Sequence, residues 1–144
     1  MQSDIGYLLK VIQENAERLA NQIYRPADLT SAQVRLMKYV RSREGRMATQ
    51  KEIEQYFQVS HPTVVGIVQR LEHKGFVRTE MDERDKRKKL IFLTEYEEKM
   101  YQQMKSSHVE MEHILTAGMT EEQIRRLSEL LSLVLCNLKE REER

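Results

Sequence analysis

Apolar residues recur every three or four positions over most of this chain, which is the spacing of one face of an α-helix. Residues 5–25 carry such a stripe, and Pro26 follows it, a residue that lacks the amide proton needed to continue a helix. The same spacing predicts further helices over 30–44, 49–57, 60–74, 94–117 and from 120 toward the C-terminus. Gly45, Gly75 and Gly118 stand where three of these stripes end. We therefore expect a mainly α-helical protein.

The starts of the predicted helices carry a second signal, the capping box. In this motif a Thr or Ser side chain and a Glu or Gln three residues later bond to each other's backbone amides. Four such pairs precede an apolar stripe: Thr30 with Gln33, Thr49 with Glu52, Thr94 with Glu97, and Thr120 with Gln123. Ser60 is a further N-cap candidate, because Pro62 is tolerated in a first helical turn. These positions predict where five helices begin.

Two short β-prone runs interrupt the helical pattern, FVRTEM at residues 76–81 and KLIFL at 89–93. Eight consecutive charged residues, from Asp82 to Lys89, separate the apolar parts of the two runs. A β-hairpin with a charged tip explains this arrangement.

Two short helices joined by a tight turn near Val59, and then a hairpin, predict a winged helix-turn-helix. The fold class we expect is mainly α (an α+β winged helix), with three helices and a two-stranded wing, flanked by N- and C-terminal dimerisation helices. We predict one domain over residues 1–144. Within it, residues 29–93 form the DNA-binding module, and residues 1–28 and 94–144 form a helical dimerisation region.

The helix that begins at Ser60 is the expected recognition helix. If Val64, Ile67, Val68 and Leu71 pack inward, its outward positions are small or polar and carry no carboxylate. The candidate DNA contacts in and before this helix are Thr49, Ser60, His61, Pro62, Thr63, Val65, Gly66, Gln69 and Arg70. His61, Thr63 and Gln69 have donors and acceptors that could read base edges, and the Val65 side chain could meet a thymine methyl group.

The charged hairpin tip is the second expected contact with DNA. The candidate residues are Arg84, Lys86, Arg87 and Lys88, because a narrow minor groove concentrates negative potential and attracts such cations. We interpret Asp82 and Asp85 as braces that pair with neighbouring arginines and hold the loop in shape. Residues 29–93 contain 14 basic and 8 acidic side chains, whereas the flanks contain 10 and 15. A basic module between acidic flanks favours a polyanionic partner.

The terminal helices have more apolar surface than one small module can bury, which predicts a subunit interface. The last helix has apolar residues at alternating spacings of three and four, as in helices that pack lengthwise. The predicted interface comprises Ile5, Leu8, Leu9, Ile12, Ile124, Leu127, Leu131, Val134 and Leu138.

Other classes of protein are poorly supported. No glycine-rich phosphate loop, nucleophile pairing or zinc motif is present, so we expect neither an enzyme nor a cofactor. His108 and Glu112 share a helix face, with His113 beside them, but no third or fourth ligand can be named and no metal site is predicted. Cys136 is expected to be a buried structural thiol. The absence of a leader or of an apolar run of membrane-spanning length leads us to expect a cytoplasmic protein without a membrane partner.

The stretch from Leu29 to Thr94 resembles the DNA-binding core of the MarR (multiple antibiotic resistance regulator) family. The resemblance rests on Leu29-Thr30 with Gln33, Leu71-Glu72 with Gly75-Phe76-Val77-Arg78, and Asp82-x-Arg84-Asp85-x-Arg87 followed by Leu93-Thr94. The chain departs from the family pattern at Glu97, where glycine is usual, and at Gly66, where many relatives have a larger polar residue. We interpret Glu97 as an exchange of one helix-start device for another.

The resemblance implies an obligate homodimer whose first and last two helices interlock, so that two winged modules read a pseudo-palindromic operator in double-stranded DNA. It also implies that Arg87 enters the minor groove. The leading hypothesis is a transcriptional regulator that acts as a repressor and is relieved by a small-molecule effector between the helical base and the winged module. The residues of that effector pocket are not predicted. The alternative is a winged-helix protein–protein interaction module with no DNA partner.

Overall fold

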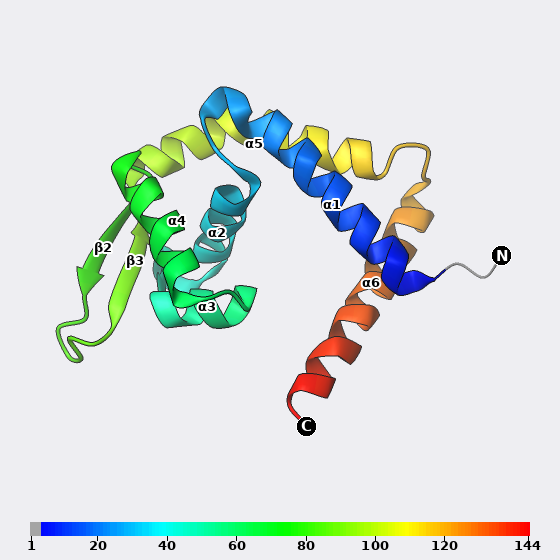
Figure 1. Cartoon of the computed structure of the whole chain (residues 1–144). Helices are drawn as coiled ribbons and strands as arrows, with labels where there is room; N and C mark the ends of the chain where they lie inside the picture. The colour runs from blue at the N-terminus through cyan, green and yellow to red at the C-terminus, as the bar shows by residue number, and fades with distance from the viewer. Residues whose placement is uncertain (1–3) are drawn as a thin grey trace. The chain divides into compact units, whose positions relative to one another are not determined.

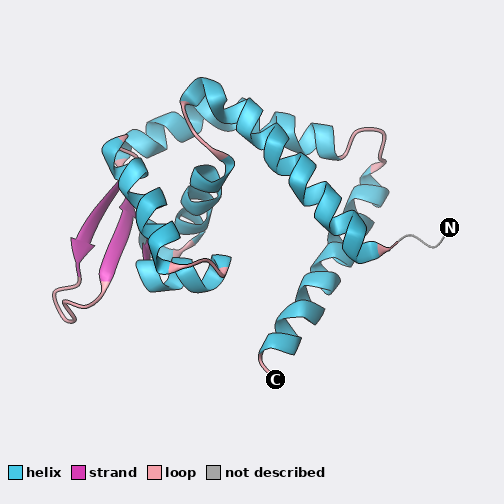
Figure 2. Cartoon of the chain, viewed as in Figure 1, coloured by secondary structure: helices cyan, strands magenta, loops and turns pink. Residues whose placement is uncertain are grey.

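The computed structural model describes residues 4–144 as helices joined by short turns, with a small antiparallel sheet (Figures 1 and 2). The α-helices are α1 (Ile5–Tyr24), α2 (Ser31–Ser42), α3 (Gln50–Phe57), α4 (His61–His73), α5 (Glu95–Leu115) and α6 (Glu121–Glu142). The strands are β1 (Met47–Thr49), β2 (Val77–Met81) and β3 (Lys89–Leu93), and the 3-10 turns are η1 (Arg25–Ala27) and η2 (Glu44–Arg46). The predicted mainly helical fold is confirmed.

The chain forms two compact units, of which the first ends at Ser107 and the second begins at His108. The first unit contains α1 to α4, the sheet and most of α5. The second contains the end of α5 and the whole of α6. The predicted division into a module of residues 29–93 and flanking dimerisation segments follows a different criterion and stays a prediction.

The predicted helix starts are observed, with one difference. Complete capping boxes form at Thr30, Thr49 and Thr120, and the hydroxyl of Ser60 accepts a hydrogen bond from the amide of Thr63. At Thr94 only half of the box is present.

The incomplete box at Thr94 is explained by the strand that precedes it. The hydroxyl of Thr94 accepts from the amide of Glu97 at 3.2 Å, but the amide of Thr94 itself donates to the carbonyl of Phe76. The carboxylate of Glu97 bonds to Arg41 instead. The interpretation of Glu97 as a helix-start device was therefore wrong for its side chain, because α5 starts against the sheet and not in solvent.

The core of the first unit lies between α2, α3, α4 and the sheet. Its buried apolar side chains include Val34, Leu36, Met37, Val40, Ala48, Ile53, Val64, Val68, Leu71, Phe76, Val77 and Ile91. In α4 the buried residues are Val64, Val68 and Leu71, each of which contributes roughly 1.5–3 kcal/mol by leaving water. Their spacing places them on one stripe, so the opposite stripe of α4 faces outward.

The sheet contains the predicted hairpin and one strand that the sequence did not reveal. Strands β2 and β3 pair from Val77 with Leu93 to Met81 with Lys89. Among the described residues, β1 pairs with the other edge of β3, giving the order β1-β3-β2 and three strands instead of two. A strand of three residues is too short to show an apolar alternation, and it is formed only because β3 offers a free edge.

Two further observations concern α6 and the chain as a whole. Cys136 is exposed on α6, so its expected burial is wrong for this single chain. No helix within residues 4–144 is both long and apolar enough to cross a membrane.

Candidate nucleic-acid interface

The first turn of α4 presents the polar side chains that the sequence predicted to face outward. His61, Pro62 and Thr63 are exposed, and so is Ser60, which caps the helix. The hydroxyls of Ser60 and Thr63 lie 2.8 Å apart. No acidic residue occurs between Ser60 and Leu71, so this part of the helix carries no charge that would repel a phosphate.

The later outward positions of α4 are less uniform. Gln69 and Arg70 are exposed, whereas Val65 and Gly66 are only partly accessible. A Cβ atom added at Gly66 would lie 3.5 Å from Nη1 of Arg70, an ordinary contact distance. Gly66 has no side chain of its own to cover the backbone, although there is room for a methyl group there.

Helix α3 holds α4 through a tight turn. Gln58 ends α3 in the left-handed conformation, with φ of 52°, and its amide donates to the carbonyl of Glu54. The amide of Val59 also donates to that carbonyl, at 3.3 Å. Three residues thus separate the last residue of α3 from the first of α4, which is the connection expected of a helix-turn-helix.

Thr49, which was predicted to contact DNA, lies at the junction of β1 and α3. Its hydroxyl accepts from the amide of Glu52 at 3.1 Å, and its own amide donates to the Glu52 carboxylate at 2.9 Å. The side chain is partly buried and already serves as a helix cap.

The hairpin tip between β2 and β3 is an ordered loop closed by its own backbone. The amide of Asp82 donates to the carbonyl of Lys88 at 3.0 Å, and the amide of Lys88 donates to the carbonyl of Asp85 at 2.9 Å. The carboxylate of Asp82 accepts from the amide of Arg84, not from its guanidinium group. Asp85 accepts from both the amide and the Nε of Arg87, each at 3.1 Å.

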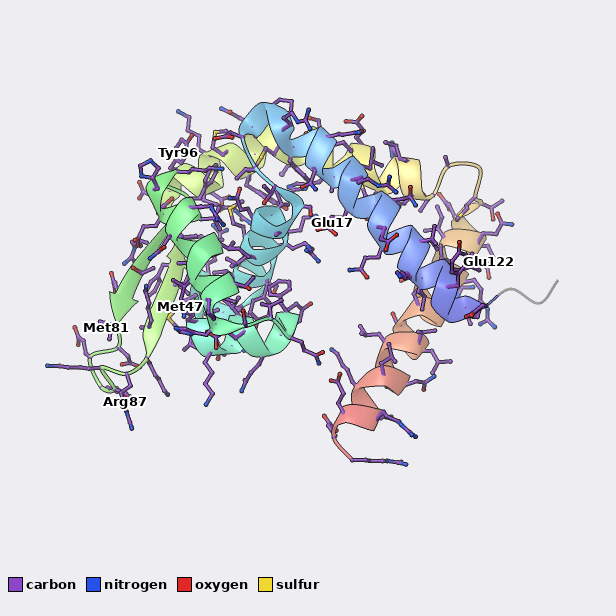
Figure 3. The ribbon with its side chains drawn as sticks, in the orientation of Figure 1. Glu17, Met47, Met81, Arg87, Tyr96 and Glu122 are labelled. Carbon is purple, nitrogen blue, oxygen red and sulfur yellow. The ribbon has the colours of Figure 1, made fainter. Side chains whose placement is uncertain are left out.

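The cations of this loop are displayed to solvent. Arg84, Lys86, Arg87 and Lys88 are exposed, and the side chain of Arg87 is 92% accessible even though it pairs with Asp85. Arg87 projects from the tip of the hairpin, away from the helices (Figure 3). The bonds from the amide and then the side chain of Arg87 lower the pKa of Asp85. Asp85 therefore stays charged while it shapes the loop.

Sequence reasoning missed a polar contact beneath the first turn of α4. Glu54, in the last turn of α3, bonds to Nδ1 of His61, and Gln50 lies within hydrogen-bond distance of both side chains. Glu54 precedes His61 by seven residues across a turn that reverses the chain, so no helical periodicity relates the two.

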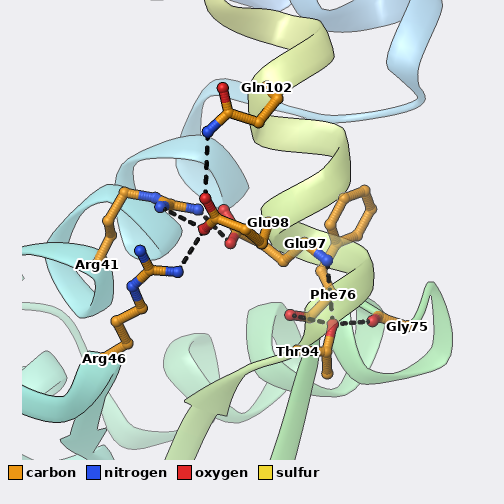
Figure 4. A network of polar contacts seen from close by, with 8 residues as sticks. All are labelled: Arg41, Arg46, Gly75, Phe76, Thr94, Glu97, Glu98 and Gln102. Atoms are coloured by element: carbon orange, nitrogen blue, oxygen red, sulfur yellow. Dashed lines mark hydrogen bonds and ion pairs between the residues drawn. The ribbon is translucent and has the colours of Figure 1, made fainter.

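A second missed group of charges ties α2 to the start of α5 (Figure 4). Arg41 bonds to Glu97 through Nη2 and to Glu98 through Nη1, the latter at 2.8 Å. Arg46 also pairs with Glu98. The guanidinium carbon of Arg41 lies 3.7 Å from the centre of the Tyr101 ring, a cation–π contact.

The electrostatics of this group depend on burial and on paired hydrogen bonds. Glu97 is 2% exposed, and its carboxylate forms an ion pair with Arg41. Bonds from Arg41 and then Gln102 lower the pKa of Glu98 from 4.5 to about 2. Burial alone would lower the pKa of Arg41, but its bonds to Glu97 and Glu98 outweigh burial and raise it. The group fixes the first turn of α5 to the winged module.

The histidines considered as metal ligands are not brought into a cluster. Glu112 and His113 are exposed and His108 is partly buried. Within residues 4–144, no three His, Cys, Asp or Glu side chains are grouped so that they could hold a metal ion.

Helices α3 and α4, followed along the chain by the charged β2–β3 hairpin, define a winged helix-turn-helix protein. Known proteins agree with this class. The MarR family model matches residues 27–88. YwoH, an uncharacterized HTH-type transcriptional regulator of Bacillus subtilis (strain 168), is 34% identical over 132 residues, which cover 90% of this chain and 94% of YwoH.

Solved structures of two DNA complexes are similar to this chain over most of its length. MepR of S. aureus in complex with DNA has a TM-score of 0.81 at 26% identity, over 94% of this chain and 99% of MepR. A mutant of E. coli MarR complexed with operator DNA has a TM-score of 0.76 at 26% identity, over 92% and 99% of the two chains. The chain belongs to the MarR family of HTH-type transcriptional regulators, as the resemblance in sequence predicted.

Proposed function

We propose that this protein binds an operator in double-stranded DNA as a homodimer and represses transcription until a small-molecule effector releases it. The observation that supports the proposal is the exposure of two successive elements, the acid-free first turns of α4 and the cation-rich tip of the β2–β3 hairpin. MepR and MarR, the structural relatives described above, have been solved with DNA. A protein with this function must be in the compartment that contains the DNA, and we therefore propose that it is cytoplasmic.

In this proposal α4 enters the major groove. His61, Thr63 and Gln69 read base edges, since their side chains are exposed on one helix and have complementary donors and acceptors. Ser60 and Arg70 contact phosphates, which fix the register of a protein on the duplex without reading sequence. The hairpin cations lie over the neighbouring minor groove, with Arg87 as the residue inserted into it.

Two subunits would be joined through apolar faces that the described chain leaves in solvent. In α6, which spans 22 residues, none is buried, and Leu138 is 60% exposed. In α1, Ile5 and Ile12 are 58% and 55% exposed. Large exposed apolar surfaces of this kind mark interaction sites. We propose a second copy as the partner, with residues 1–28 and 94–144 as the dimerisation region.

The dimer is tested by placing a charge within the apolar stripe of α6. Leu131→Glu should convert the dimer to monomer, because a carboxylate would be desolvated in the interface. Ser132→Glu is the matched control, since it adds the same charge to the same helix about a quarter of a turn away from Leu131. Sedimentation at several protein concentrations measures the outcome. A Leu131→Glu variant that sediments as the wild type does would exclude this face from the interface.

An effector would bind in a hollow of about 600 Å³ in the first unit, lined by residues of α1, η1, the link from η1 to α2, the start of α2, and Lys74. Lys74 follows α4 and donates to the side chain of Gln33 in α2 at 3.2 Å and to the carbonyl of Asp28. A ligand that competes for Lys74 would disturb the end of the recognition helix. Since the two recognition helices must match successive turns of DNA, a small displacement would reduce affinity.

The experiment that tests the function is selection of bound fragments from a random DNA pool, with and without candidate ligands. A symmetric consensus is expected for a dimer, and loss of selection with a ligand would identify an effector. Absence of binding to nonspecific duplex at low salt and micromolar protein would favour the protein-interaction alternative.

A further inference from the structure

The contact between α3 and the first residue of α4 constrains how His61 can hydrogen-bond. Oε1 of Glu54 lies 2.5 Å from Nδ1 of His61 and 3.3 Å from Nε2 of Gln50. The Glu54 side chain is 21% exposed, and that of His61 is 69% exposed. The carboxylate is thus largely covered, while the imidazole ring is open to solvent and to a ligand on the α4 surface.

The chemistry of a carboxylate decides which ring nitrogen carries the proton. An ionised carboxylate oxygen can only accept hydrogen bonds, so Nδ1 of His61 must be an N–H donor. Nε2 of Gln50 donates to the same oxygen. Its 3.0 Å separation from Nδ1 of His61 therefore joins two donors that share one acceptor. Nε2 of Gln50 also lies 3.5 Å from Nε2 of His61, which is too long for a normal hydrogen bond.

A neutral imidazole has one N–H group, so a proton held on Nδ1 leaves Nε2 with a lone pair. In the major groove a lone pair can accept only from an amino group, which means N6 of adenine or N4 of cytosine. The other tautomer would instead donate to N7 of either purine, to O6 of guanine or to O4 of thymine. Cytosine therefore pairs only with the acceptor tautomer, guanine and thymine pair only with the donor tautomer, and adenine can pair with either.

We propose that Glu54 determines base specificity by fixing His61 as an acceptor, so that His61 selects an adenine or cytosine amino group in each half-site. The inference rests on the proposed function, because it assigns a base contact to a protein that must first bind DNA specifically. Glu54 itself touches no base. It is a positioning residue, and Gln50 helps to hold it by donating to the same oxygen.

Two variants test the contact on DNA at about pH 8, where a free imidazole is neutral. Affinity is measured for all four base pairs at every operator position. His61→Ala identifies the contacted position, where the wild type should prefer an amino-bearing base by about tenfold, a value within the range for one base contact. Glu54→Gln should reduce that preference to about two- or threefold, because an amide can both accept and donate and so permits either tautomer.

A matched control separates tautomer from charge. Glu44→Gln removes the same charge from the same module, at an exposed residue of η2, and should leave every base preference unchanged. In the His61→Ala background, Glu54→Gln should have no further effect on preference. Thermal melting verifies that each variant is folded.

The tautomer is also measurable in the free protein by long-range ¹H–¹⁵N correlation of the imidazole nitrogens. The wild type should show the proton of His61 on Nδ1, and Glu54→Gln should show signal from the Nε2–H form. A wild type that selects no DNA sequence would refute the proposed function and the base contact together. Specific selection with a guanine or thymine preference at the His61 position, an unchanged preference in folded Glu54→Gln, or a proton on Nε2 in the wild type would overturn this inference alone.

Discussion

Replacing Arg41 with methionine removes the only guanidinium group that bonds to Glu97 among the described ion pairs, and leaves a carboxylate that is 2% exposed. Breaking a buried ion pair in this way costs about 3–5 kcal/mol, because the remaining charge stays desolvated. We expect a loss of about 3 kcal/mol, the lower end of that range. The Arg41 side chain is itself 17% exposed, so water can reach part of the group.

The assay is urea unfolding, at one protein concentration for all variants because a dimer's stability depends on concentration. In thermal unfolding, the same loss of about 3 kcal/mol would lower the melting temperature by roughly 10 °C for a chain of this size. The double variant Arg41→Met with Glu97→Leu removes both charges and should recover most of the loss, since replacing a buried pair by apolar residues is often neutral or stabilising.

Comparison of the wild type, the single variants Arg41→Met and Glu97→Leu, and the double variant gives the coupling energy between the two side chains. Lys38→Met is a suitable control, because Lys38 is an exposed cation of the same helix. The reasoning is refuted if Arg41→Met costs less than about 1 kcal/mol, the size expected of a surface pair, or if the double variant is no more stable than Arg41→Met alone.

The remaining predictions concern DNA binding, helix propensity and acid stability. Arg87→Ala should decrease the slope of log affinity against log salt concentration by about 1.8, which is about 0.9 for each copy in a dimer. Gln69→Ala should change the base preference and leave that slope unaltered. Equal slopes for the two variants would contradict this division of roles. Gly66→Ala should raise the free energy of unfolding by roughly 0.5–1 kcal/mol, because alanine favours the helix interior and its Cβ would make only an ordinary contact. Its affinity for the operator should decrease if the backbone at Gly66 lies close to DNA. A gain in affinity together with stability would argue against such a close contact. The pKa of Glu98 is lowered from 4.5 to about 2 by its bonds with Arg41 and Gln102, so its contribution to stability is present above pH 4.5 and is lost as pH falls toward 2. Acid unfolding of Glu98→Gln should accordingly show a weaker pH dependence in that window, and an unchanged dependence would exclude Glu98 as its source.

The helices and the hairpin were predictable because their signals are local. Each of α1 to α6 begins within two residues of the predicted start, since a cap and an apolar stripe act within a few turns of chain. The stripe of Val64, Val68 and Leu71 also predicted which side of α4 faces outward. The charged run between β2 and β3 was correctly placed at a hairpin tip, because a run of eight charges cannot be buried.

The tertiary structure alone decided which of these side chains meet. Strand β1 exists because Met47 to Thr49 reaches the free edge of β3, more than forty residues later in the chain. Glu97 follows a threonine at capping-box spacing, yet it bonds to Arg41, 56 residues away. Glu54 and His61 meet because the chain reverses at Gln58, which adopts the left-handed conformation. A glutamine in the sequence does not predict that conformation, because residues other than glycine rarely adopt it. Periodicity and caps reflect interactions within one helix. The contacts above depend instead on how separate elements pack, and no local pattern in a single sequence predicts that packing.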